Sequence, residues 1–158
     1  YLGPLISGDD LVAGLHAPAS VWECPQLVRL DDRWVLLVSL WVEAEELMDH
    51  LTGVAYLVGD LRMQHGRPTF VAESGGLADE GADFYAPQCV VDDAGERTLL
   101  WAWSWEGAGR SPLEIEASGY NGALTFPREL RLTGNGHLVV TPARELTDLR
   151  SDRLEAAS

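Results

Sequence analysis

A hairpin pattern that occurs twice constrains the fold of this chain more than any other feature. Residues 25–41 begin with Pro-Gln, continue as an apolar segment, turn at an Asp-Asp pair and end as an aromatic-rich segment. Residues 87–105 follow the same order, 62 positions later. Each copy predicts a β-hairpin. A fixed period of this length is typical of proteins built from repeated structural units.

Short apolar segments bounded by turn residues predict strands along most of the chain. The predicted strands lie at residues 27–30, 34–41, 54–58, 69–72, 88–91, 97–105, 130–132 and 137–140. Helix is expected only locally, around residues 44–51 and from about residue 146. One period therefore contains about four strands, which is the content of a propeller blade. We predict an all-β fold and favour a propeller over a sandwich, since a sandwich gives no reason to repeat the Pro-Gln pair and the Asp-Asp turn together.

Composition limits the classes of partner. The 158 residues include 11 basic and 25 acidic side chains, for a formal net charge of −14. This balance argues against binding nucleic acid or an anionic membrane by general attraction. No stretch approaches the roughly 18 consecutive apolar residues of a membrane span. The four histidines lie far apart, so no metal or cofactor is expected. The start at Tyr1 is interpreted as a cut or processed end.

Glu23 and Tyr85 precede the two Pro-Gln pairs by two residues each. In a propeller they would occupy corresponding positions at the entrance of successive inner strands, where side chains from several blades meet in a central funnel. Two other interpretations remain open. Glu23 is a solvated surface residue in one, and Tyr85 only packs its ring in the other.

Cysteine and tryptophan allow further expectations. Cys24 and Cys89 are too few for a disulfide framework and are expected to be reduced and buried in strands. Trp101, Trp103 and Trp105 alternate, which predicts one face of a strand. That face could pack against other strands or contact a sugar.

Three segments in the same order resemble glycoside hydrolase family 32, the family of invertases, levanases and inulinases. Residues 22–25 resemble its Glu-Cys motif, and residues 79–88 resemble its Asp-x-Gly-x-Asp-Phe-Tyr-Ala segment. Residues 122–130 resemble its Gly-x-Leu-Thr-x-Pro-Arg-Glu-Leu segment. The resemblance covers residues 2–150 and corresponds to the C-terminal half of the family's catalytic domain.

The resemblance implies a fold and a reaction. Residues 1–145 would form part of a five-bladed β-propeller, about two and a half blades of four-stranded antiparallel sheets. Residues 146–158 would be a charged tail or the start of a connection to a β-sandwich. The family hydrolyses β-fructofuranosidic bonds of sucrose or fructans with retention: one carboxylate attacks the anomeric carbon, and a carboxylic acid protonates the leaving oxygen.

The resemblance also assigns roles to residues. Glu23 would be the acid/base, and Tyr85 and Asp83 would contact the catalytic carboxylates or the substrate. Cys24 would pack behind the acid without reacting, and Trp22 would lie beside it. No metal ligand is implied.

Departures from the family pattern limit the predicted activity. The chain contains neither the Asn-Asp-Pro-Asn-Gly motif of the nucleophile nor the Arg-Asp-Pro motif of the transition-state stabiliser, and Gln26 stands where the family often has Asp. We therefore expect the isolated chain to be inactive. Its expected partners are the missing N-terminal half of the propeller, or other copies of the chain through self-association, and a fructose-containing saccharide. The alternative is a non-catalytic carbohydrate-binding or assembly module.

Overall fold

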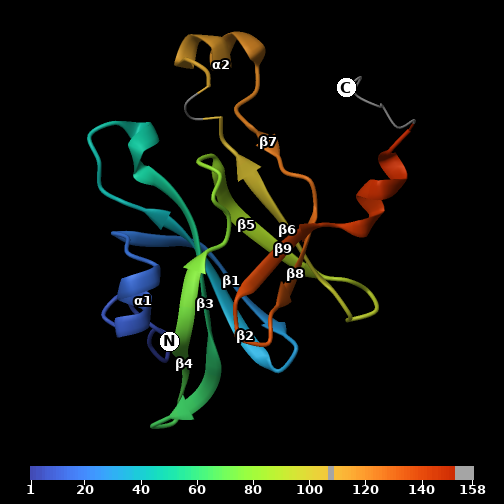
Figure 1. The fold of residues 1–158 in the computed structure, drawn as a ribbon. Coiled ribbons are helices and arrows are strands. Elements are labelled where there is room, and N and C mark those ends of the chain that lie inside the picture. Colours follow the sequence, from blue (N-terminus) through green and yellow to red (C-terminus); the bar gives the residue numbers. More distant parts are fainter. Residues whose placement is uncertain (107–108, 152–158) are drawn as a thin grey trace.

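The computed structural model describes residues 1–106 and 109–151, and its strands form two antiparallel sheets (Figure 1). Sheet A has the order β1 (Val21–Leu30), β2 (Arg33–Trp41), β3 (Leu51–Gln64) and β4 (Arg67–Leu77). Sheet B has the order β5 (Phe84–Val91), β6 (Thr98–Ser104), β8 (Arg128–Leu132) and β9 (Leu138–Pro142), and β7 (Ala123–Leu124) pairs with β6. The predicted all-β fold with antiparallel sheets is thus confirmed.

Four short helical segments lie between or beside the strands. They are α1 (Leu11–His16), α2 (Pro112–Ser118) and the two 3₁₀ turns η1 (Leu47–His50) and η2 (Arg144–Leu149). The 3₁₀ turns confirm the two places where local helix was expected. The helices α1 and α2 were not predicted, because six and seven residues are too few to show a helical period.

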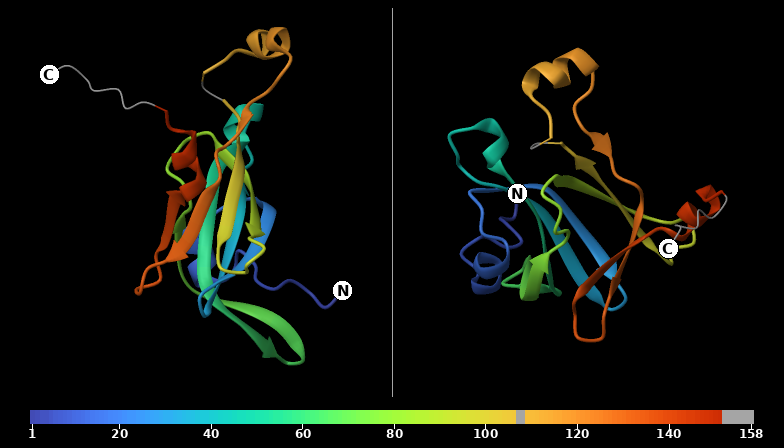
Figure 2. Two further views of the ribbon diagram at one scale, coloured as in Figure 1. Left: turned by 90° about the vertical axis from the view of Figure 1, so that its right-hand side faces the viewer. Right: turned by 45° about the horizontal axis from the view of Figure 1, so that its top comes forward.

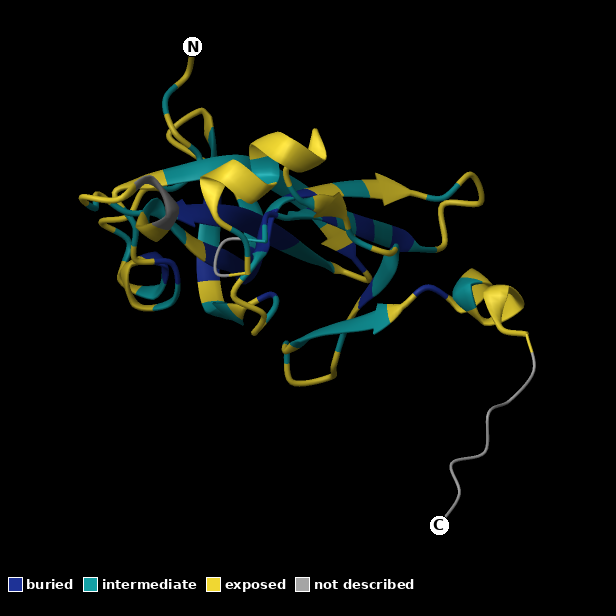
Figure 3. Cartoon of the chain, turned by 90° about the horizontal axis from the view of Figure 1, so that it is seen from above, coloured by how far each residue is buried: buried dark blue, intermediate teal, exposed yellow. Residues whose placement is uncertain are grey.

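The main core lies between the two sheets, and a second core lies on the other face of sheet A. Alternation along β2 separates them: Val35 and Leu37 belong to the core facing sheet B, whereas Leu36 and Val38 pack toward α1 and the N-terminal segment. Because both faces of β2 are covered, its sequence reads as a continuous apolar run. Figure 3 shows the buried residues concentrated in the middle of the strands, while α2 is exposed.

The sequence repeat corresponds to a repeated backbone irregularity. The pairing of β1 with β2 shifts register between Glu23 and Gln26, and the pairing of β5 with β6 shifts between Tyr85 and Gln88. A non-glycine residue with positive φ lies inside each shift. These two residues are Cys24 with φ 47° and Ala86 with φ 50°. Bulges of this kind kink a strand and redirect its side chains.

Long connections leave both sheets at the same ends. Trp41 pairs with Val21 and Ser104 pairs with Phe84, so the segments that follow β2 and β6 begin beside the starts of β1 and β5. Figure 2 shows η1 and α2 projecting from this end of the molecule in both views. The resemblance implied about two and a half blades. The described strands form two sheets, and no part of a third sheet is found among them.

Candidate active site

Glu23 and Tyr85 meet across the gap between the two sheets. The Tyr85 hydroxyl donates a hydrogen bond to Oε2 of Glu23 at 2.8 Å. Tyr85 is only 3% exposed, and Glu23 is partly buried. The two equivalent positions of the repeat therefore hold a carboxyl group and a phenol in direct contact.

The bulge in β1 explains how Glu23 reaches this position. A positive φ costs an L-residue roughly 1–2 kcal/mol, and Cys24 adopts one immediately after Glu23. Beyond the bulge, Oε1 of Gln26 accepts a hydrogen bond from the Cys89 amide at 3.0 Å. Sheet A is thereby tied to β5. Where the family often has a carboxylate, the side-chain oxygen of Gln26 still provides a hydrogen-bond acceptor.

Burial and charge keep the groups beside Glu23 protonated. Burial is the largest cause that raises the pKa of Tyr85, and the hydrogen bond to Glu23 and the charge of that carboxylate raise it further. Burial also raises the pKa of Cys24, with a second contribution from Glu23. Tyr85 therefore remains a hydrogen-bond donor at neutral pH. Cys24 remains a thiol, the form that is poorly nucleophilic.

Trp22 is not brought together with the Glu23–Tyr85 pair. It packs against the cluster that contains α1, and its indole Nε1 donates to the carbonyl oxygen of Ala17 at 2.8 Å. Glu23, which pairs with Ser39, lies on the opposite face of sheet A from Trp22. The structure thus gives Trp22 a packing partner on the far side of the strand.

Asp83 lies immediately before β5, close to the pair along the chain. Its carbonyl oxygen accepts a hydrogen bond from the Trp105 amide at 3.1 Å, and it lines a cavity of about 230 Å³ with Asp79 and Arg128. Asp79 accepts a hydrogen bond from the Gly81 amide at 2.7 Å and forms an ion pair with Arg128. Asp79 therefore stabilises the turn that precedes β5.

Comparison with known proteins identifies the family. Residues 9–142 match the family described as "Glycosyl hydrolases family 32 N-terminal domain". The chain belongs to glycosyl hydrolase family 32. The relatives of this family 32 chain include a sucrose-6-phosphate hydrolase of Vibrio alginolyticus, 33% identical over 137 residues, and a levanase of Bacillus subtilis, 31% identical over 144 residues. These matches cover 85% and 82% of the chain but only 28% and 20% of the relatives.

Solved structures of the family have the same fold as this chain. A β-fructofuranosidase variant of Bombyx mori, solved in complex with sucrose, covers 98% of the chain with a TM-score of 0.71 and 27% identity. A fructan 1-exohydrolase variant of Cichorium intybus, solved in complex with 1-kestose, covers 83% with a TM-score of 0.62 and 25% identity. The chain spans 31% and 26% of these two chains, respectively.

The tryptophans of this family 32 chain do not all share one environment. Trp101 and Trp103 are partly exposed on the face of sheet B opposite the buried Leu100 and Ala102. Trp105 lies beyond the end of β6 and is 6% exposed. Trp105 is therefore a buried packing residue, and the other two rings belong to an open face of the sheet.

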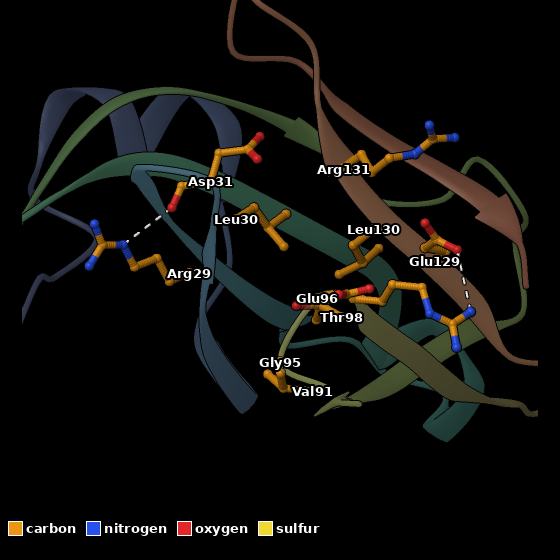
Figure 4. Close-up of a pocket in the computed structure, with 11 residues that line it drawn as sticks. Arg29, Leu30, Asp31, Val91, Gly95, Glu96, Thr98, Glu129, Leu130 and Arg131 are labelled. Carbon is orange, nitrogen blue, oxygen red and sulfur yellow. Dashed lines mark hydrogen bonds and ion pairs between the residues drawn. The ribbon is translucent and has the colours of Figure 1, made fainter. Parts of the chain in front are cut away.

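A cleft of about 560 Å³ lies at the opposite end of the strands from Glu23 (Figure 4). Leu30 and Leu130 approach each other between the sheets there, whereas the guanidinium groups of Arg29 and Arg131 point away in different directions. These side chains do not converge on a common point. The cleft is thus a gap between hairpin ends, whereas Glu23 and Tyr85 converge at the other end of the strands.

Two residues beside the pair were missed by sequence reasoning. Ser39 is fully buried, and its Oγ accepts a hydrogen bond from the Ala86 amide at 3.0 Å. Its signal was a single hydroxyl within an otherwise apolar strand. Gln26 was noted as a departure from the family, but its bond to Cys89 depends on how the two sheets pack.

The described ranges, 1–106 and 109–151, hold no group of three His, Cys, Asp or Glu side chains arranged for a metal ion. Within the same ranges, no helix has both the length and the apolar character needed to cross a bilayer.

Proposed function

We propose that this chain supplies the acid/base part of the active site of a retaining β-fructosidase. The hydrogen bond between Tyr85 and Glu23 is the observation that carries the proposal, because it joins the family's Glu-Cys and Asp-Phe-Tyr-Ala motifs. A partly buried carboxyl group held by a neutral phenol donor, with one oxygen still available, is suited to proton transfer.

Glu23 would act twice in the reaction. In the first step its carboxylic acid gives a proton to the glycosidic oxygen as the bond from that oxygen to the anomeric carbon breaks, and a carboxylate nucleophile forms a bond to the same carbon. In the second step Glu23 takes a proton from the water that displaces the nucleophile. No hydrogen bond from the described residues reaches Oε1, which leaves this oxygen free for both transfers. The nucleophile would come from outside residues 1–158.

The two sheets would be successive blades of a five-bladed propeller. The strands β1 and β5 would be their inner strands, since each begins at a motif that carries a residue of the pair. Residues 1–145 would belong to this propeller fragment, and residues 146–158 would lead away from it. Tyr85, Asp83 and Cys24 would support the acid, while Trp22 would support its strand.

The substrate would be a fructose-containing saccharide. The names of the relatives refer to sucrose 6-phosphate and levan, and two structural neighbours were solved with sucrose and 1-kestose. The partly exposed rings of Trp101 and Trp103 lie on a different face from the acid, so we assign them to packing against further sheets. Direct contacts with the fructose would come from the end of the molecule where η1 and α2 project.

A chimera would test this proposal. Residues 1–158 would replace the matching segment of the Bacillus subtilis sucrose-6-phosphate hydrolase, which is 33% identical over 155 residues. The expected result is sucrose-6-phosphate hydrolysis that falls at least about 10³-fold in Glu23→Gln, since the amide cannot donate the proton. An equal loss in Glu80→Gln, a nearby exposed carboxyl group, would contradict the assignment.

The isolated chain should be inactive. Without a second catalytic carboxylate, purified residues 1–158 should release no reducing sugar from sucrose, levan or inulin. Hydrolysis by the isolated chain that is abolished by Glu23→Gln would refute the requirement for an external nucleophile.

A second candidate is an assembly or carbohydrate-binding module without catalysis of its own. The open face of sheet B favours it: Val90 is 53% and Leu124 is 73% exposed, next to the partly exposed Trp101 and Trp103. An uncovered apolar face of this kind marks an interaction site. Calorimetry with fructose or sucrose distinguishes the two candidates, because the module would bind sugar in the isolated chain, whereas the incomplete enzyme site would not.

A further inference from the structure

The bulge of β5 leaves a backbone amide without a partner in its own sheet. Tyr85 pairs with Trp103 and Gln88 pairs with Trp101, so the two residues between them face the single residue Ala102 on β6 and are out of register with it. One is Pro87, which has no N–H, and the other is Ala86, whose N–H must find another acceptor. An unsatisfied amide in this position would cost about 1–3 kcal/mol.

Ser39 of sheet A provides that acceptor. Its Oγ lies 3.0 Å from the Ala86 nitrogen, and the residue is 0% exposed. On sheet A, Ser39 is the direct pairing partner of Glu23. One hydroxyl therefore joins the strand position opposite the acid to the kink that immediately follows Tyr85.

We propose that Ser39 is a positioning residue that holds the Tyr85 hydroxyl against Glu23. The effect of Ser39 on catalysis depends on the function proposed above, but its effect on the contact between Tyr85 and Glu23 does not. The Ala86 kink has φ 50°, a strained conformation for alanine that persists only where its surroundings hold it. When the Ser39 hydroxyl is removed, the kink relaxes and carries Tyr85 with it. A displacement of about 1 Å would take the 2.8 Å contact beyond hydrogen-bonding distance.

Tyrosine NMR on the full chain tests the proposal without any assay of activity. The ring carbon that bears the hydroxyl is labelled with ¹³C, and Tyr85→Phe assigns its signal among the four tyrosines. In Ser39→Ala the Tyr85 signal should shift and should titrate at a lower pH than in the wild type, because the phenol loses its contact with the Glu23 charge. In the same variant the Ala86 amide should exchange with solvent at least about tenfold faster.

Two variants control for general loosening. Thr125→Val removes a bond of the same kind, from the Ala102 amide to Oγ1 of Thr125 at 3.0 Å, and should leave the Tyr85 signal unchanged. Ser39→Thr keeps a hydroxyl and should restore the wild-type titration. If Ser39→Ala does not fold, Ser39→Cys serves instead: sulfur is a weak acceptor, and an intermediate shift is expected.

The proposal is wrong if folded Ser39→Ala or Ser39→Cys retains the wild-type Tyr85 titration, or if Thr125→Val shifts it equally. Kinetics in the chimera separate this outcome from failure of the proposed function. Ser39→Ala should lower kcat about tenfold with KM changed by less than about twofold, since a positioning residue acts on the reacting geometry. An inactive chimera would refute the proposed function, while the NMR titration would still decide the role of Ser39.

Discussion

At the scale of single residues, the Glu23–Tyr85 contact joins a carboxyl group, which we propose transfers a proton, to a phenol that keeps its own proton. Tyr85 is buried and its pKa is raised, so it donates a hydrogen bond over the whole neutral range. Glu23 is less buried and keeps one oxygen free of the described residues. The phenol orients the carboxyl group, and in the proposed mechanism it would not compete with that group for the transferred proton.

The titration of Tyr85 should therefore depend on Glu23. Glu23→Gln removes the charge and the carboxylate acceptor, so the pKa of Tyr85 should fall, while burial, the largest cause, keeps it above the ordinary value of 10.0. Ultraviolet difference titration near 295 nm measures this. A Tyr85 midpoint unchanged by Glu23→Gln would show that burial alone sets it.

The raised pKa also predicts how stability changes in alkali. Because the phenol ionises more easily in the unfolded chain, its contribution to stability is fully present below pH 10 and is lost as the pH rises toward the folded-state pKa. Urea unfolding at a series of pH values should show a smaller alkaline loss of unfolding free energy in Tyr85→Phe than in the wild type.

At the scale of elements, the strands were predictable and the two α-helices were not. Apolar segments and the turn residues that bound them located all the longer strands, although β3 extends to Gln64, well beyond the predicted residues 54–58. The sequence did contain one unused signal: Ser111 and Glu114 form a capping box at the start of α2. The contacts of Ser39 and Gln26 were not predictable, because they depend on the distance between two sheets rather than on any local pattern.

The connection between β6 and β7, which contains α2, should be sensitive to substitution of one glycine. A Cβ at Gly122 would lie 2.2 Å from the Trp103 Nε1 and 2.3 Å from the Ser104 carbonyl oxygen, and its φ is 76°. Gly122→Ala should therefore lower the free energy of unfolding by about 2–4 kcal/mol, from overpacking and positive φ together. Chemical denaturation measures the change.

Substitutions at two other glycines distinguish the effect of overpacking from the effect of a positive φ. Gly119 has φ 75° but no atom within 4 Å of the added Cβ, so Gly119→Ala should cost only about 1 kcal/mol. Gly134 has neither constraint, and its alanine variant should be close to neutral. Equal losses at all three positions would contradict the close approach of Gly122 to Trp103.

At the scale of the whole molecule, Arg97 connects three parts of the C-terminal half. Its guanidinium pairs with Asp92 in the β5–β6 turn at 3.0 Å, with Glu129 on β8 at 3.7 Å and with Glu145 in η2 at 2.8 Å. The side chain is 15% exposed, so water screens these contacts less than it would on an open surface. Arg97 therefore fixes the segment that follows β9 against sheet B.

Acid should weaken this attachment. The hydrogen bonds from Arg97 hold the pKa of Glu145 down at about 2, so the stabilisation is present above the ordinary glutamate value of 4.5 and is lost as the pH falls toward 2. The protection factors of the η2 amides, which remove the intrinsic pH dependence of exchange, should fall over that interval in the wild type. In Glu145→Gln they should be low at every pH, and a wild-type profile in that variant would argue against the Arg97 contact.

The open face of sheet B should make the isolated chain associate with itself. Sedimentation velocity should show a weight-average mass that rises with concentration, because contact buries Val90, Leu124 and their neighbours. Leu124→Lys should reduce the association by placing a charge in the contact. Leu113→Lys, on the exposed helix α2, should have no effect, and a purely monomeric wild type would contradict the prediction.

The kinks at Cys24 and Ala86 bear on how such a site can arise by duplication. Each kink aims the side chain that precedes it, and neither depends on whether that side chain is an acid or a phenol. Duplication of a strand together with its kink therefore gives a second side chain the same orientation. One substitution in one copy is then enough to turn two identical positions into a donor and an acceptor.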